Sequence, residues 1–174
     1  QRSLVGSEMC IRDSLNNDTE IINPEIEKAL KIAPSKKGGN GSNFPDIKLF
    51  IQTKSLRKIP VMVEVKGKKG ALIKVNASNE IDNIKKDGSP NFTNINKYAV
   101  NGAIHYANAI INNSITYKEA IAVGLNGYDE PGGRIYEIET YYISRDNYCI
   151  PKRLKTYEDL SFLLPGNIDK PVSY

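Results

Sequence analysis

The sequence predicts an α/β domain with a mixed central β-sheet flanked by α-helices. Segments 46–52 and 61–66 alternate between apolar and other residues, as half-buried strands do. Segment 94–111 instead repeats its apolar residues at helical spacing. The order of predicted elements is helix, two or three strands, helix and two further strands, and 174 residues suffice for one such domain with a real core.

Both ends of the chain are set apart from this domain. The first fourteen residues, QRSLVGSEMCIRDS, resemble a translated sequencing-adapter read-through and lack the basic start and apolar stretch of a signal peptide. A genuine N-terminal arm is the alternative. We expect the domain to cover 15–164 and residues 165–174 to form a truncated linker toward a missing C-terminal region. With Cys10 excluded, Cys149 stands alone, which predicts neither an internal disulfide nor a cysteine-rich zinc site.

The composition is that of an ordinary globular protein, with 40% hydrophobic and 25% charged residues. No apolar run approaches the roughly 20 residues of a membrane span, so we expect a soluble, cytoplasmic protein. The net charge of +4 permits an anionic partner without requiring one.

The first helix is expected to open at Asn23-Pro24-Glu25 and to end at Leu30 or Ile32, because Pro24 suits a first helical turn. A glycine-rich loop follows. The remaining expected elements are strands at 46–52, 61–66 and 71–75, a long helix at about 94–111, a strand at 120–125, a turn at 129–133, a strand at 134–144 and a last helix at 157–163.

The strand at 61–66 carries the first chemical signal. Successive side chains of a strand point to opposite faces, so Val61, Val63 and Val65 share the face expected to be core. Met62, Glu64 and Lys66 share the other face, where Glu64 and Lys66 lie about 7 Å apart along the strand. An exposed strand with alternating valines and charges would give the same pattern.

Asp46 supplies the second signal, because it begins the preceding strand. If the two strands pair antiparallel, the carboxylates of Asp46 and Glu64 converge at one end. Mg²⁺ prefers such hard oxygen ligands, and it can polarise a phosphoryl oxygen and lower the pKa of a bound water. Lys66 beside them could orient that water or neutralise charge that develops on a phosphate.

Pro45-Asp46, followed after eighteen residues by Glu64-Val65-Lys66, resembles the motif of the PD-(D/E)XK nucleases. Segment 43–144 resembles, more narrowly, the N-terminal nuclease domain of some restriction–modification proteins, in which an adenine-DNA methyltransferase can follow. The resemblance implies a restriction-endonuclease-like core and a Mg²⁺-dependent endonuclease that cuts double-stranded DNA. It implies Asp46 and Glu64 as metal ligands, Lys66 as the catalytic lysine, and a methyltransferase domain or subunit as partner; a homodimer is a further option.

Such nucleases often carry another acidic residue on the first helix. Glu27 is our candidate and Glu25 the second, with a solvated helix face as the alternative for both. On the long helix, four polar residues recur on one face: Lys97, Asn101, His105 and Asn108. The first three are candidates to contact DNA phosphates. His105 could instead be a hydrogen-bonded structural residue.

Two basic loops are expected near the site, at Lys36-Lys37 and at Lys68-Lys69. Lys68 and Lys69 could hold the DNA backbone, although solvated loops would look the same. A DNA-binding module with the nuclease core but without cleavage remains the alternative function. A methyltransferase is not predicted for these residues, because the Asn-Pro-Pro-aromatic motif of such enzymes is missing.

Overall fold

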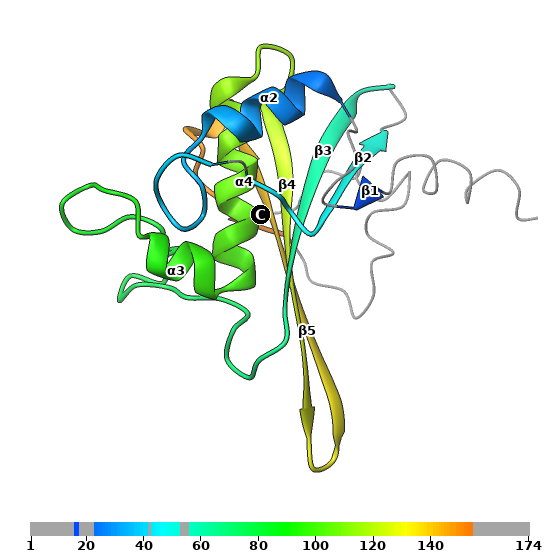
Figure 1. Cartoon of the computed structure of the whole chain (residues 1–174), viewed down its shortest axis with the longest axis vertical. Coiled ribbons are helices and arrows are strands. Elements are labelled where there is room, and N and C mark those ends of the chain that lie inside the picture. The colour runs from blue at the N-terminus through cyan, green and yellow to red at the C-terminus, as the bar shows by residue number, and fades with distance from the viewer. Residues whose placement is uncertain (1–15, 18–22, 42, 53–55, 155–174) are drawn as a thin grey trace, which may run out of the picture.

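The computed structural model describes residues 16–17, 23–41, 43–52 and 56–154. Within these residues the chain forms one six-stranded sheet in the order β1-β2-β3-β4-β5-β6 (Figure 1). β3 and β4 are parallel, and every other neighbouring pair is antiparallel. The strands are β1 (Asn16–Asn17), β2 (Ile47–Gln52), β3 (Lys58–Lys66), β4 (Glu119–Glu130), β5 (Gly133–Ser144) and β6 (Lys152–Arg153). The mixed sheet with its helices confirms the predicted fold class.

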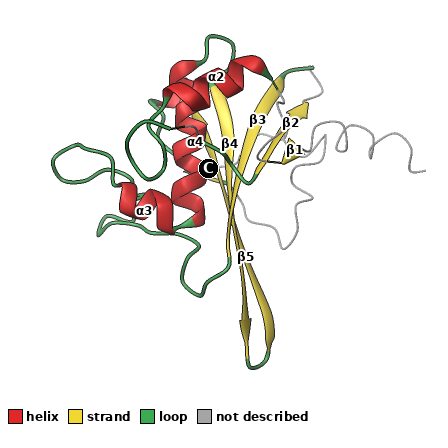
Figure 2. Cartoon of the chain, viewed as in Figure 1, coloured by secondary structure: helices red, strands yellow, loops and turns green. Residues whose placement is uncertain are grey.

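The described helices are α2 (Pro24–Ile32), α3 (Phe92–Lys97), α4 (Ala99–Asn113) and the short 3₁₀ helix η1 (Arg145–Asn147). Helices α2 and α4 cover the same face of the sheet (Figure 2). Two hydrophobic clusters join them to it: one between α4 and strands β4 and β5, the other between α2, α4 and Met62 of β3. A third cluster on the sheet contains strand residues only, among them Val61 and Val63.

Helix α2 forms where the sequence predicts it. Asn23 caps its first turn, because its Oδ1 accepts hydrogen bonds from the backbone N–H of Glu25 (2.9 Å) and Ile26 (3.3 Å). Pro24 occupies the first turn, where its missing N–H costs nothing. Ile26, Ala29 and Leu30 are buried against the sheet and α4.

The long helix expected at 94–111 is two helices, which corrects the sequence-based prediction. The chain breaks at Tyr98, whose backbone is extended (φ −112°, ψ 139°). The first N–H groups of α4 then donate to a loop, Ala99 N to Ala71 O and Val100 N to Leu72 O, both at 2.9 Å. The expected third strand at 71–75 is therefore wrong. Its carbonyls cap α4, and Val75 makes only an isolated bridge with Ile81.

The two last long strands form a hairpin that runs well beyond the helices (Figure 1). The strand expected at 120–125 extends to Glu130, so the turn shrinks to Pro131-Gly132 before Gly133 (φ 127°). β5 agrees with its prediction at 134–144. The expected leader 1–14, helix 157–163 and linker 165–174 lie outside the described residues. In the described parts of the chain, no helix has the length and apolar character to cross a membrane.

Candidate active site

The antiparallel pairing of β2 with β3 brings the two predicted carboxylates together. Ile47 is the partner of Val63 in this ladder, so the preceding residue, Asp46, lies opposite Glu64. Residues opposite each other in such a pair have Cβ atoms about 5 Å apart. The backbone N–H of Val65 donates to Asp46 Oδ2 at 2.6 Å, which fixes this carboxylate against the end of β3. The convergence expected from the sequence is present.

Glu64 is fully buried and is the centre of the site. Its Oε1 accepts hydrogen bonds from two ammonium groups, Lys66 Nζ and Lys36 Nζ, each at 2.6 Å. Among the described residues, its Oε2 has no hydrogen-bond partner. A buried carboxylate oxygen without a partner is costly and calls for a ligand.

Two glycines allow α4 to close over Glu64. A Cβ on Gly102 of α4 would lie 3.2 Å from Glu64 Cγ. Gly124 stands beside Glu64 in the parallel ladder, and a Cβ there would lie 2.6 Å from the backbone N of Val100. Tyr106, one helical turn after Gly102, is also buried, and its hydroxyl donates to Phe44 O at 3.2 Å. The helix thus shields Glu64 from water.

The site holds as many carboxylates as ammonium groups, and burial and neighbouring charges shift the pKa values of Asp46 and Tyr106. Loss of hydration raises the pKa of Asp46, and the nearby Glu64 charge adds to this, although the Val65 N–H and both lysines oppose it. Burial, and then the negative charges of Glu64 and Asp46, raises the pKa of Tyr106. Tyr106 therefore lines the site as an uncharged phenol. The charged groups of the site are two carboxylates, of Asp46 and Glu64, and two ammonium groups, of Lys36 and Lys66.

These donors fit a hard divalent cation. Mg²⁺ is commonly held by only one or two carboxylates, and its other positions are left to water and phosphate oxygens. The candidate ligands are Glu64 Oε2, which has no hydrogen-bond partner among the described residues, and the carboxylate of Asp46, which lies opposite Glu64 in the ladder. The described residues contain no group of three or more His, Cys, Asp or Glu side chains suited to a metal, so two protein carboxylates are what this part of the chain provides.

The acidic residues of α2 have other partners. Glu27 Oε1 pairs with Lys48 Nζ at 2.7 Å. Lys48 is buried two residues after Asp46, on the same face of β2, so Glu27 reaches the vicinity of the site but faces a lysine. Glu25, the second candidate, accepts hydrogen bonds from Ser114 Oγ, Ile115 N and Thr116 N (2.7–2.9 Å) and anchors the end of α4.

The single polar face predicted for 97–108 does not exist, because the break at Tyr98 puts Lys97 on α3. Lys97 is exposed beside the Tyr98 ring. Asn101 is fully buried, and its amide holds the backbone of Lys74 and the side chain of Asn83, so the expected phosphate contact of Asn101 is wrong.

His105 has a structural partner. Its Nε2 lies 2.8 Å from Pro34 O, and burial lowers its pKa, which favours the neutral ring that donates to this carbonyl. This is the structural alternative considered for His105. The last residue of the predicted polar face, Asn108, is partly buried.

The loop after β3 is held close to the site. Asn126, opposite Lys66 in the parallel ladder, is buried, and its amide bonds both the N–H and the carbonyl of Lys68. The Lys68 side chain is exposed, and Lys69, also exposed, pairs with Glu130 at 2.6 Å. Both predicted lysines therefore border the site on an anchored loop.

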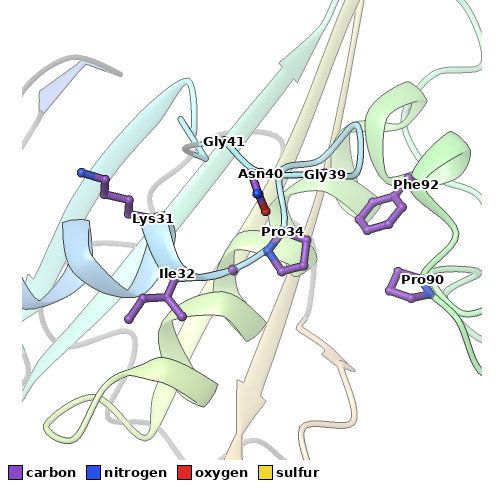
Figure 3. Close-up of a pocket in the computed structure, with 9 residues that line it drawn as sticks. Lys31, Ile32, Pro34, Gly39, Asn40, Gly41, Pro90 and Phe92 are labelled. Carbon is purple, nitrogen blue, oxygen red and sulfur yellow. The ribbon is translucent and has the colours of Figure 1, made fainter.

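From the sequence, Lys36 was predicted only to lie in a basic loop near the site, and its contact with Glu64 was not predicted. It lies in the segment between α2 and β2, and its Nζ lies 2.6 Å from Glu64 Oε1. A pocket of about 640 Å³ lies beside this loop, between segments 31–41 and 90–92 (Figure 3). Pro34, Pro90 and Phe92 give it a largely apolar lining.

The chain is similar to the type II restriction enzyme and methyltransferase RM.BcgI of Heyndrickxia coagulans. The two sequences are 32% identical over 148 residues, which cover 85% of this chain and 20% of that protein. The chain thus spans about one fifth of the length of this relative. No family model and no solved structure matches the chain. Over these 148 residues, the chain is therefore similar in sequence to part of that restriction enzyme and methyltransferase.

Proposed function

We propose that this chain is a Mg²⁺-dependent endodeoxyribonuclease domain of a restriction–modification system, with Asp46 and Glu64 as metal ligands and Lys66 as the catalytic lysine. One observation carries the proposal: Glu64, which is buried opposite Asp46 in the strand ladder, has one oxygen without a hydrogen-bond partner among the described residues, while two lysines hold its other oxygen. The similarity to a type II restriction enzyme supports the same reaction class.

The reaction is hydrolysis of a phosphodiester. Water adds to phosphorus, one bridging P–O bond breaks, and the released oxygen takes up a proton. A bound Mg²⁺ supplies polarisation of the phosphoryl oxygen and a lowered pKa of the attacking water. Lys66 can place one of its three N–H donors on a phosphate oxygen or on that water, because its side chain is 21% exposed at the edge of the site.

The packing around Glu64 supports this role. α4 and Tyr106 keep water away from one side of the carboxylate, which strengthens the electrostatic interactions there. The Val65 N–H holds Asp46 in place before a ligand arrives, so little reorganisation is needed.

Double-stranded DNA is the proposed substrate. The exposed Lys68 and Lys69 border the site on an anchored loop, where they can contact phosphates on either side of the scissile bond. Such contacts position DNA without reading its sequence. Because the relative is named both restriction enzyme and methyltransferase, we propose a methyltransferase domain or subunit as the functional partner.

A plasmid assay tests the proposal. The 174-residue chain is incubated with supercoiled plasmid and either MgCl₂ or EDTA, over a range of protein concentrations because cleavage can require a dimer. Glu64→Gln and Lys66→Met should each reduce nicking by on the order of 10²-fold or more. Their controls are Glu119→Gln, in an ion pair with Arg57 near the end of β3 that is remote from Lys66, and Lys58→Met, at that same end of β3.

Nicking that persists in EDTA, or in both site variants, would refute the proposed enzyme. Binding of the plasmid without nicking at any protein concentration would favour the alternative function, a DNA-binding module that does not cleave.

A further inference from the structure

We propose that Lys36 is a second active-site lysine, which contacts the phosphate of a DNA strand bound at Asp46 and Glu64. This inference rests on the proposed nuclease function and adds to it a substrate contact that lies outside the nuclease motif. It starts from one contact, the 2.6 Å hydrogen bond from Lys36 Nζ to Glu64 Oε1, between residues 28 positions apart in the sequence.

Glu64 already has a lysine partner without Lys36. Lys66 Nζ donates to the same oxygen at the same distance, so Lys36 is not needed to supply Glu64 with a partner. Two ammonium groups that are each 2.6 Å from one oxygen lie no more than about 5 Å apart (twice 2.6 Å) and repel each other. A pair of cations held so close is a favourable place for a further anion.

Most N–H donors of the Lys36 and Lys66 ammonium groups remain available to a ligand. Each has three N–H donors, and each uses one on Glu64. Lys36 Nζ also lies 5.8 Å from the centre of the Tyr106 ring. The Lys36 and Lys66 side chains are 26% and 21% exposed, so a ligand can reach both from solvent. A phosphate has two non-bridging oxygens, which suits two such donors.

Hydrogen bonds within the loop define the backbone that holds Lys36. Gly38 N donates to Ser35 O at 2.8 Å, and Ser35 Oγ donates to Gly38 O at 2.9 Å, which closes a turn around Lys36. Gly38 has a φ of 81°, and a Cβ there would lie 3.1 Å from the Phe92 ring. The His105 contact fixes the start of the loop at Pro34. The ammonium group is thus delivered to the site by a defined backbone.

The chain offers a matched control in the next residue. Lys37 has the same charge and lies on the same loop, but its side chain is exposed and makes no ion pair with any residue in the described part of the chain. Lys36→Met and Lys37→Met each remove one positive charge and keep an unbranched stem. A difference between the two variants therefore reports the position of Lys36 and not the charge of the loop.

Three measurements separate a phosphate contact from a structural role. Binding of a fluorescent 30-base-pair duplex is followed by anisotropy at several NaCl concentrations without divalent metal. Cleavage is followed in single turnovers with Mg²⁺ at saturating protein, and unfolding by thermal denaturation. For Lys36→Met we expect the slope of log Kd against log salt to fall by about 1 and cleavage to slow by about 10²-fold. Lys37→Met should keep its saturating cleavage rate within about twofold.

Several outcomes would overturn the inference. If Lys36 only positions Glu64, Lys36→Met leaves the salt slope unchanged even where cleavage falls. A variant with wild-type slope and wild-type cleavage refutes any contact with DNA, and a lowered melting temperature with an unchanged slope assigns Lys36 to folding. If the wild type binds DNA but does not cut it, the proposed nuclease function fails, while the salt slope still decides whether Lys36 meets a phosphate. A wild-type chain that does not bind DNA at all overturns both.

Discussion

The charge of Glu64 can be removed without changing the shape of the site. Glu64→Gln preserves the side-chain volume, so the packing against Gly102 and α4 is retained and no cavity forms. The substitution leaves Lys36 and Lys66 beside a neutral amide. Any loss of stability therefore reports electrostatics, and any loss of cleavage reports the missing carboxylate.

The magnitude follows from the distances. Two ammonium nitrogens no more than about 5 Å apart (twice 2.6 Å) repel each other by at least about 3 kcal/mol at an effective dielectric constant near 20. Both lysines are partly exposed and can turn toward water, which reduces this cost. We expect Glu64→Gln to lower the free energy of unfolding by about 2 kcal/mol in the absence of metal.

Urea denaturation at low and high salt measures this effect, with Glu130→Gln as control. Glu130 forms a single exposed ion pair with Lys69, whose loss should cost less than about 1 kcal/mol. Adding Lys66→Met to Glu64→Gln should restore part of the lost stability, because one of the two opposing cations is removed. A Glu64→Gln chain as stable as wild type, without any rescue by Lys66→Met, would refute the view that the carboxylate holds two opposed ammonium groups together.

Three further predictions concern single residues. Asp46→Asn should stabilise the fold at pH 7 by less than about 1 kcal/mol, because the raised pKa of Asp46 means that its ionised carboxylate disfavours the folded state. This gain in stability should shrink as the pH falls toward 3.8. Thermal melts that show a constant gain across pH would contradict the prediction. Glu25→Gln should lower the melting temperature at pH 7, since hydrogen bonds from residues 114–116 lower the pKa of Glu25 to about 2. The difference in melting temperature between the two proteins should fade as the pH falls from 4.5 to 2. Equal melting temperatures at pH 7 would argue against an anchoring role of Glu25. Gly124→Ala should lower the free energy of unfolding by about 1–3 kcal/mol, because the new Cβ would meet the Val100 backbone. Gly132→Ala is the control and should be tolerated, because its Cβ would point into open space. Equal chemical denaturation midpoints of the two variants would show that α4 can move away from Gly124.

Local pattern in the sequence was enough for much of the fold. Asn23 and Pro24 mark the start of α2 because capping depends on adjacent residues. The period of two at 61–66 puts Glu64 and Lys66 on one face, which is a property of any strand. The prediction of which face is core was only partly right. On the assigned face Val61 and Val63 are buried but Val65 is 43% exposed, and Met62 and Glu64 on the opposite face are fully buried under the helices. A strand in the interior of a sheet can be covered on both sides, and its alternation does not report this.

Hydrophobic periodicity in the sequence could not predict the break between α3 and α4. The apolar stripe that predicted the helix begins only at Val100, so it does not fix where the helix starts. The chain breaks at Tyr98, where loop carbonyls at Ala71 and Leu72 accept hydrogen bonds from the first N–H groups of α4. The same long-range packing buries Asn101 against Lys74 and Asn83, so a polar residue expected to face DNA serves the interior instead.

The same distinction between local pattern and long-range packing applies to the site. The sequence by itself determined that Glu64 and Lys66 are neighbours on one strand face and that Asp46 begins the strand before, because these relations depend on spacing alone. Only the tertiary structure decided that β2 and β3 pair so that Asp46 meets Glu64, that Gly102 and Gly124 let α4 bury this carboxylate, and that Lys36 reaches the same oxygen as Lys66. The physical reason is that contacts between separate elements are set by how those elements pack, and local periodicity carries no record of that packing.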